Sequence, residues 1–224
     1  MGKWRVVTID GPAGAGKSTV ARRLADRLNW RLLDTGAMFR AVTLAALRTG
    51  LDLTKDEALG ELAGRLTVRL PPGMVLLDGE DVTSAIRGVE VTRATRYAAD
   101  SPSVRRTLIG WQRDFAEAEG HVITEGRDQG TIVFPDAFLK FYLTASDEER
   151  ARRRHAEHQA RGEEIAPGEV LRDLVERDAQ DAARAIAPMR PAEDARLIDS
   201  TGLELDRVVD SIEREIRRST GETD

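Results

Sequence analysis

Hydrophobic residues along the chain follow two spacings, one typical of strands and one typical of helices. Short β-branched or apolar runs predict strands at residues 5–9, 32–33, 121–124, 138–143 and 197–198. Helical patterns predict helices that begin at Lys17 and then cover about 38–46, 89–99, 102–118, 170–184 and 205–216. A very basic helix at 150–158 is predicted by the capping signal before it. The opening order of strand, loop, helix and short strand is typical of an α/β fold with a parallel sheet.

Residues 66–79 follow a different pattern, in which short apolar runs alternate with turn residues. Pro71-Pro72-Gly73 separates two such runs, and Asp78-Gly79 follows the second. This spacing predicts short strands joined by tight turns. We therefore expect a small lobe with short strands, inserted into the α/β core at about residues 52–101.

Capping signals predict where two of the helices begin. Ser101 and Pro102 suit the N-cap and the first position of a helix. Ser146 and Glu149 have the spacing of a capping box, in which each residue pairs with the backbone of the other. The helix after Ser146 is rich in arginine.

Composition narrows the class of protein. A chain of 224 residues that is 41% hydrophobic can bury one full core, and its net charge of −5 argues against a general nucleic-acid binder. The absence of cysteine excludes disulfides and thiolate metal sites. No apolar run approaches the roughly 20 residues of a membrane span, and the first residues do not resemble a signal peptide. We expect a cytoplasmic protein with no nucleic-acid or membrane partner and, because no oligomer-forming seam is evident, a monomer.

The strongest motif follows the first predicted strand and opens the first predicted helix. It satisfies G-x-x-x-x-G-K-[ST] and consists of Gly11, Pro12, Ala13, Gly14, Ala15, Gly16, Lys17, Ser18 and Thr19. Its glycines allow backbone amides to surround phosphates, next to the positive end of the helix dipole. Lys17 is expected to reach the β- and γ-phosphates of ATP, and the Ser18 hydroxyl to bind Mg²⁺. The sequence thus predicts a three-layer P-loop NTPase core.

Other P-loop classes carry further motifs that this chain lacks. No Asn-Lys-x-Asp motif of GTPases and no Leu-Ser-Gly-Gly signature of ABC-type ATPases occurs in the sequence. The strand at 121–124, followed by Glu125, could be a degenerate Walker B strand. A phosphate acceptor needs no strong general base but does need cations to screen two anions. Arginines in fixed loops, and no catalytic histidine, are therefore expected.

Several segments resemble bacterial cytidylate kinases, from Val6 to about Thr201. The resemblance lies in the substrate-loop motif at 33–40, the run Glu125-Gly126-Arg127-Asp128-Gln129-Gly130 with its continuation to Ala137, the lobe at 81–91, and the closing motifs at 177–184, 187–189 and 192–195. It implies an ATP-dependent (d)CMP kinase with Mg²⁺ as cofactor. The implied organisation is a single domain, with a core at about 1–51 and 102–224, a CMP-binding insertion at 52–101 and a lid at about 150–168.

The resemblance also implies roles for single residues. For CMP they are Asp34 and Thr35 in the substrate loop, Arg40, Arg127 and Arg184 at the phosphate, Arg177 and Asp181 at the ribose, and Arg105 and Asp128 at the cytosine edge. Lys17, Arg153 and Arg177 are the expected catalytic residues, and Arg150, Arg152 and Arg154 complete a lid over ATP. A carboxylate at the base would accept from the N4 amine of cytosine and repel the O4 atom of uracil.

Two positions depart from the family pattern. Phe39 stands where the family often has Tyr, and Arg96-Tyr97 stands where a small Ser and a short polar residue are expected, so Thr95 could supply the hydroxyl there. Two alternatives stay open from the residues. One is another P-loop kinase, such as a UMP, dTMP or shikimate kinase, with Asp34 as base for a hydroxyl acceptor. The other is a binding module in which ATP only switches conformation.

Overall fold

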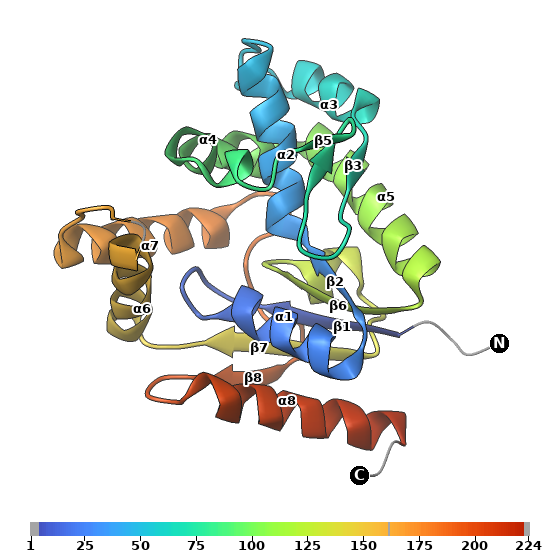
Figure 1. Cartoon of the computed structure of the whole chain (residues 1–224), viewed down its shortest axis with the longest axis vertical. Helices are drawn as coiled ribbons and strands as arrows, with labels where there is room; N and C mark the ends of the chain where they lie inside the picture. The colour runs from blue at the N-terminus through green and yellow to red at the C-terminus, as the bar shows by residue number, and fades with distance from the viewer. Residues whose placement is uncertain (1–4, 161, 222–224) are drawn as a thin grey trace. The chain divides into compact units, whose positions relative to one another are not determined.

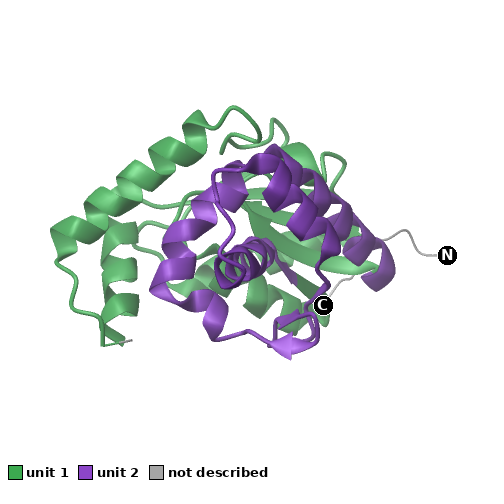
Figure 2. Cartoon of the chain, turned by 90° about the horizontal axis from the view of Figure 1, so that it is seen from above, with its two compact units in different colours: residues 1–32, 120–224 green, residues 33–119 purple. Residues whose placement is uncertain are grey.

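The computed structural model describes residues 5–160 and 162–221 of the chain. The chain forms two compact units, residues 1–32 with 120–224 (unit 1) and residues 33–119 (unit 2), which Figure 2 colours separately. Among the described residues, no helix has the length and apolar character needed to cross a membrane.

A five-stranded sheet forms the centre of the α/β core. Its strands, in the order in which they lie side by side, are β2 (Arg31–Asp34), β6 (His121–Gly126), β1 (Arg5–Asp10), β7 (Leu139–Thr144) and β8 (Arg196–Asp199). β1 pairs in parallel with both β6 and β7, and β7 pairs in parallel with β8. The parallel pairing and all five strand predictions are confirmed.

Helices of unit 1 bury their apolar faces against this sheet. α1 (Lys17–Leu28) and α8 (Leu205–Thr220) pack against each other and contribute to one core cluster with β1, β6 and β7 (Figure 1). α8 buries Val208, Val209, Ile212 and Ile216, the apolar face expected from the sequence. The carboxyl ends of β1 and β6 lead into the loops that carry the phosphate motif and Arg127-Asp128.

The two remaining helices of unit 1 contain the predicted lid. α6 (Asp147–Ala160) and α7 (Pro167–Ala183) pack side by side, and residue 161 between them lies outside the described residues (Figure 1). The amide of Glu149 donates to Ser146 Oγ over 3.2 Å, so the predicted cap is present. Ala151 of α6 and Val170 of α7 form a small buried cluster that includes Ala13 of the phosphate loop.

Unit 2 contains four helices and the expected short strands within its described residues. They are α2 (Thr35–Arg48), α3 (Asp56–Arg65), β3 (Val68–Arg69), β4 (Leu76–Leu77), β5 (Glu80–Asp81), the 3₁₀ turn η1 (Ala85–Arg87), α4 (Val89–Asp100) and α5 (Pro102–Glu119). The strands pair as an antiparallel sheet in the order β3-β4-β5. Ser101 Oγ accepts from the amide of Val104, as the predicted cap requires.

The sequence did not predict α3, although it spans ten residues. Gly60 and Gly64 lie within this helix, and glycine lowers helix propensity. Gly60 is required by packing, because a Cβ there would lie 2.4 Å from the Cβ of Ser103 on α5. The predicted insertion at 52–101 falls within unit 2, and its bounds stay a prediction.

Candidate active site

The phosphate motif forms the turn between β1 and α1 with the backbone that its glycines allow. Gly11 has a φ of 144°, and a Cβ there would lie 2.0 Å from the carbonyl oxygen of Leu143. Gly16, with a φ of 90°, is the N-cap of α1. Since glycine has no side chain, no capping group competes for the first amides of the helix. These amides, at the positive end of the dipole, suit a phosphate ligand.

Lys17 is buried at the start of α1. Its Nζ donates to the carbonyl oxygen of Pro12 over 2.8 Å. The pKa of Lys17 is lowered to about 7, chiefly by burial and then by the positive charge of Arg127, while the carboxylate of Glu125 opposes the change. A lysine in such surroundings gains from an anion nearby, because an anion compensates the cost of its buried charge.

Ser18 and Glu125 form an oxygen pair beside Lys17. The hydroxyl of Ser18 donates to Glu125 Oε1 over 2.9 Å, and Glu125 is buried near the end of β6. Hydroxyl and carboxylate oxygens are ligands that suit Mg²⁺, which commonly takes few protein ligands together with substrate phosphates. No group of three or more acidic, histidine or cysteine residues that could hold a metal occurs in the described part of the chain. The donor set therefore fits Mg²⁺ delivered with a nucleotide.

Three arginines of unit 1 surround Asp181 of α7. Arg127 Nε donates to Asp181 Oδ2 over 3.0 Å, and Arg184 pairs with the other carboxylate oxygen. Burial alone would raise the pKa of Asp181, but the guanidinium charges, led by that of Arg127, hold it below its usual value. The charge of Arg177 acts on both Asp181 and Lys17. The structure thus brings together Lys17 and three of the five arginines expected at CMP.

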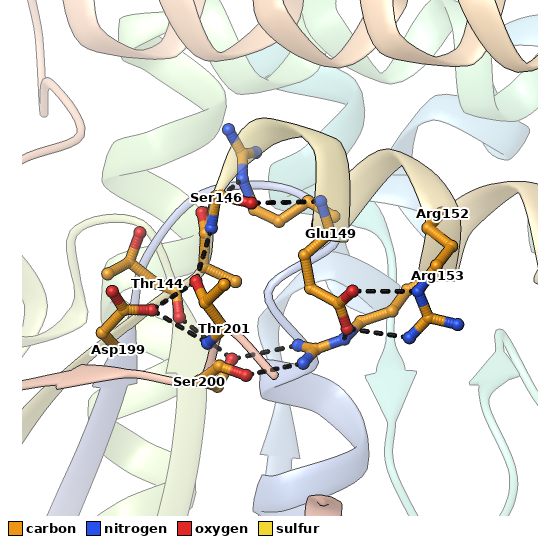
Figure 3. A network of polar contacts seen from close by, with 10 residues as sticks. Thr144, Ser146, Glu149, Arg152, Arg153, Asp199, Ser200 and Thr201 are labelled. Carbon is orange, nitrogen blue, oxygen red and sulfur yellow. Dashed lines mark hydrogen bonds and ion pairs between the residues drawn. The ribbon is translucent and has the colours of Figure 1, made fainter. Parts of the chain in front are cut away.

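The predicted lid arginines differ in their surroundings. Arg153 Nη1 and Nη2 donate to Ser200 Oγ over 3.0 Å and to Ser200 O over 2.7 Å, and its Nε donates to Glu149 over 2.8 Å (Figure 3). A Cβ on Gly16 would lie 4.0 Å from Arg153 Nη1, so this guanidinium lies beside the phosphate loop. Arg152 is exposed and pairs with Glu149, whose pKa is lowered to about 2 chiefly by the hydrogen bond from Arg152. Arg154 pairs with Glu157 over 2.7 Å.

Arg150, the fourth predicted lid arginine, is buried. Its Nε donates to the carbonyl of Ala145, its Nη1 donates to the carbonyl of Ala13, and it pairs with Asp147 and Asp178. All of these contacts lie within unit 1. This geometry is that of a residue that holds the phosphate loop, and a direct contact of Arg150 with ATP stays a prediction.

The remaining predicted CMP residues lie in unit 2, except for the buried Asp128, which follows Arg127 in unit 1. Asp34 caps α2, accepting from the amide of Ala37 over 2.9 Å, with Thr35 buried and Arg40 half-buried on the same helix.

Arg105 is buried, donates through Nε to the carbonyl of Ala99 over 2.6 Å, and lies 5.3 Å from the ring centre of Phe39. Phe39 thus keeps a ring contact without a hydroxyl.

The two departures on α4 also have defined surroundings. Arg96 lies over the ring of Tyr97, 4.9 Å from its centre, and donates to the Tyr97 hydroxyl over 3.1 Å. Thr95 donates its hydroxyl to the carbonyl of Val91 over 2.6 Å. The hydrogen of Thr95 is therefore engaged in its own helix, and only its oxygen lone pairs could meet a base.

The sequence did not indicate the contacts of two acidic residues in unit 1, the buried Asp10 and the half-buried Asp178. Asp10, directly before Gly11, accepts from the amides of Gln129 and Gly130, and Asp178 accepts from the amide of Ala13. A polar residue at the end of an apolar strand was the only signal for Asp10. Asp178 lies next to Arg177 in the closing motif at 177–184. Its partner Ala13 is 165 positions away in the sequence, so the motif alone could not indicate this contact.

Comparison with known proteins gives one family over nearly the whole chain. The family model described as cytidylate kinase matches residues 7–218. A cytidylate kinase from Pseudomonas aeruginosa (strain LESB58) is 46% identical over 219 residues, covering 95% of each chain. A cytidylate kinase from Desulforamulus reducens is 50% identical over 215 residues, covering 95% of this chain and 96% of its own. A gluconokinase structure from Sinorhizobium meliloti, 13% identical, aligns over 97% of this chain and 94% of its own with a TM-score of 0.50, a likeness of fold.

Proposed function

The chain belongs to the cytidylate kinase family, and from this premise we propose which of its residues carry each step of phosphoryl transfer. The reaction converts ATP and CMP or dCMP to ADP and CDP or dCDP. The sequence left three functions open: a kinase of CMP or dCMP, a kinase of another small molecule, and a binding module in which ATP only switches conformation. Membership of the family favours the first. The assignment of residues to steps is the proposal.

The donor phosphates are held by the turn between β1 and α1. The amides of residues 11–19 surround them, and Lys17 meets the oxygens where negative charge grows during transfer. Ser18 would hold Mg²⁺ together with oxygens of ATP. Glu125 accepts the hydrogen bond from the Ser18 hydroxyl and so supports that side chain. When bound, Mg²⁺ neutralises charge on the phosphates. The transferring phosphoryl group is stabilised by Arg153, which lies beside Gly16, and by Arg177. The lid at 150–168 lies largely on α6 and includes Arg150, Arg152 and Arg154.

The acceptor phosphate is held by arginines, and the cytosine by a carboxylate and an arginine. Arg127 and Arg184, with Arg40 of unit 2, hold the CMP phosphate, while Arg177 and Asp181 hold the ribose. Asp34 and Thr35 belong to the substrate loop. Asp128 accepts from the N4 amine, and Arg105 donates to the O2 and N3 side of the base. Because a phosphate oxygen is already ionised, this scheme needs no general base.

The observation that carries the proposal is electrostatic. The charges of Arg127 and Arg177, on the acceptor side, both act on the pKa of Lys17 on the donor side. Cations that act on one another in this way are stabilised further when they hold two phosphate groups. The charges of unit 1 therefore support the proposal that two phosphate groups are held here.

The test is an assay of ADP release with ATP and Mg²⁺ against CMP, dCMP, UMP, dTMP, AMP, GMP and shikimate. Stimulation by CMP and dCMP alone is expected. Equal stimulation by UMP would contradict the role of Asp128, and stimulation by AMP or shikimate would contradict the whole acceptor assignment. Gel filtration with light scattering would test the predicted monomer.

A further inference from the structure

Asp10 is a buried carboxylate that no step above uses. It is the last residue of β1 and directly precedes Gly11, and its side chain is almost entirely shielded from solvent. Its Oδ1 accepts from the amide of Gln129 over 2.9 Å, and its Oδ2 accepts from the amide of Gly130 over 2.7 Å. One carboxylate therefore holds two consecutive amides of the π-helical turn η2 (Gln129–Val133).

The turn can approach β1 this closely because of the residues at its start. A Cβ on Gly130 would lie 2.9 Å from Thr8 Oγ1 and 3.2 Å from Lys140 Cδ, so only glycine fits without displacement. The side chain of Gln129, also buried, accepts from the hydroxyl of Thr124 on β6 over 2.9 Å. The start of the turn is thus fixed to β1 by Asp10 and to β6 by Thr124.

This attachment lies between the two loops of the proposed reaction. Gly11 follows Asp10 directly, and Arg127 and Asp128 directly precede the amides that Asp10 holds. We propose that Asp10 is a positioning residue that sets Arg127 and Asp128, and hence the bound CMP, in place against the phosphate loop. The inference rests on the proposed roles of Arg127 and Asp128, and Asp10 itself touches neither nucleotide.

The attachment requires both oxygens of Asp10 as acceptors. A protonated carboxyl or an amide keeps one good acceptor and directs a donor towards a backbone N–H. The charged and titratable groups around Asp10 are Lys17 of α1, Asp128 of the adjoining loop, and Lys140 and Tyr142 of β7. Burial raises the pKa of Asp10 to about 6, against the effect of its two amide hydrogen bonds. The ionised form therefore dominates above pH 6.

The first test compares Asp10→Asn with Asp26→Asn, which makes the same chemical change at an exposed position of α1. For Asp10→Asn we expect the KM for CMP to rise about ten-fold, as for loss of one hydrogen bond to a charged group, with the KM for ATP changed less than about two-fold. Amide hydrogen exchange at Gln129 and Gly130 should become faster. An unchanged KM for CMP, or equal increases for CMP and ATP, would overturn the inference.

A second variant approaches the same attachment from the turn. Gly130→Ala places a methyl group against Thr8 and 3.4 Å from Asp10 Oδ2, and it should raise the KM for CMP in the same selective way. In the double variant the two effects should be less than additive, since both break one attachment. Full additivity would contradict the inference, and Gly130→Ala decides the question alone if Asp10→Asn does not fold.

The pH dependence separates positioning from a plain loss of stability. The KM for CMP of the unchanged protein should rise below pH 6 more steeply than that of Asp10→Asn, in which this position no longer titrates. The comparison cancels the titration of the CMP phosphate itself, whose second pKa is about 6. Parallel profiles would overturn the role of the ionised form.

Arg127→Ala separates this inference from the proposed function. If Arg127→Ala leaves the KM for CMP unchanged, the proposed CMP site is wrong. The inference about Asp10 is then wrong as well, even if Asp10→Asn speeds amide exchange in the turn. If Arg127→Ala raises that KM while Asp10→Asn does not, only the positioning role is wrong.

Discussion

Arg150 and Asp178 together engage both backbone polar groups of Ala13 in the phosphate loop. Arg150 Nη1 donates to the carbonyl oxygen of Ala13 over 2.7 Å, and Asp178 Oδ1 accepts from its amide over 3.1 Å. The two side chains also pair with each other. Since Arg150 lies on α6, within the predicted lid, and Asp178 lies on α7, both helices are attached to the donor loop.

Removing the charge of Asp178 should weaken ATP binding more than CMP binding. In Asp178→Asn, the amide of Ala13 and the buried Arg150 lose a charged partner, so we expect the KM for ATP to rise about five-fold and the free energy of unfolding to fall by ~2 kcal/mol. Steady-state kinetics and urea unfolding would measure both. The control is Asp173→Asn, an exposed position on the same helix. An unchanged KM for ATP would show that the attachment does not shape the donor site.

Lys17→Ala should abolish transfer almost completely. The side chain is the buried cation of the phosphate loop, and loss of such a preorganised charge should lower kcat by about 10³-fold. The matched control is Lys55→Ala, at the exposed N-cap of α3. The ADP-release assay with saturating CMP gives both rates. Turnover near that of the unchanged protein would remove Lys17 from the mechanism.

Asp128→Asn should change which base is accepted. An amide can turn its N–H₂ group towards the O4 atom of uracil, whereas the carboxylate can only accept. We expect the ratio of kcat/KM for CMP over UMP to fall by about 10²-fold, mostly through loss of CMP. Asp136→Asn, an exposed position in the same motif, is the control. If the ratio stays constant, the base is read by other residues.

Glu125→Gln should raise the Mg²⁺ concentration needed for half-maximal activity. Glu125 accepts the hydroxyl hydrogen of Ser18 and thereby orients the oxygen proposed for the metal. Loss of such a supporting carboxylate weakens metal sites by about ten-fold or more. Titration of Mg²⁺ at fixed total ATP measures the effect, with Glu119→Gln, at the end of α5, as the control. An unchanged midpoint would show that Ser18 needs no support from Glu125.

Local signals predicted the elements of this fold well, because each depends on neighbouring residues. The starts of α5 and α6 follow from Ser101 and Ser146, whose side chains make the expected capping contacts. The signal for α3 failed because two glycines interrupt it, one of them kept small by contact with Ser103. The sequence could not show that contact, which joins residues more than 40 positions apart.

The candidate site was predicted in its parts but not in its attachments. The glycine motif and the resemblance indicated Lys17, Arg127 and Asp181, and the structure brings these charges together. The resemblance also assigned Arg150 to a lid over ATP, but it gave no sign that this arginine is buried. Its burial depends on Ala13 and Asp178, which are 137 and 28 positions away. Such distant pairs leave no periodic trace in a sequence.

Asp10 should make the stability of the folded chain depend on pH in a way that Asp10→Asn removes. Its pKa is raised from 3.8 to about 6 by burial, so between these values the folded state binds more protons than the unfolded state. Its contribution to stability is therefore fully present below pH 3.8 and is lost as the pH rises through about 6. The full difference amounts to about 3 kcal/mol. Urea unfolding of both proteins from pH 4.5 to 7.5 measures about 2 kcal/mol of this difference, because the window begins above the unfolded pKa of 3.8. The difference in unfolding free energy, unchanged protein minus Asp10→Asn, should fall up to about pH 7 and then level off. A constant or rising difference would mean that Asp10 stays ionised in the folded chain throughout, and that the turn it holds is not sensitive to pH.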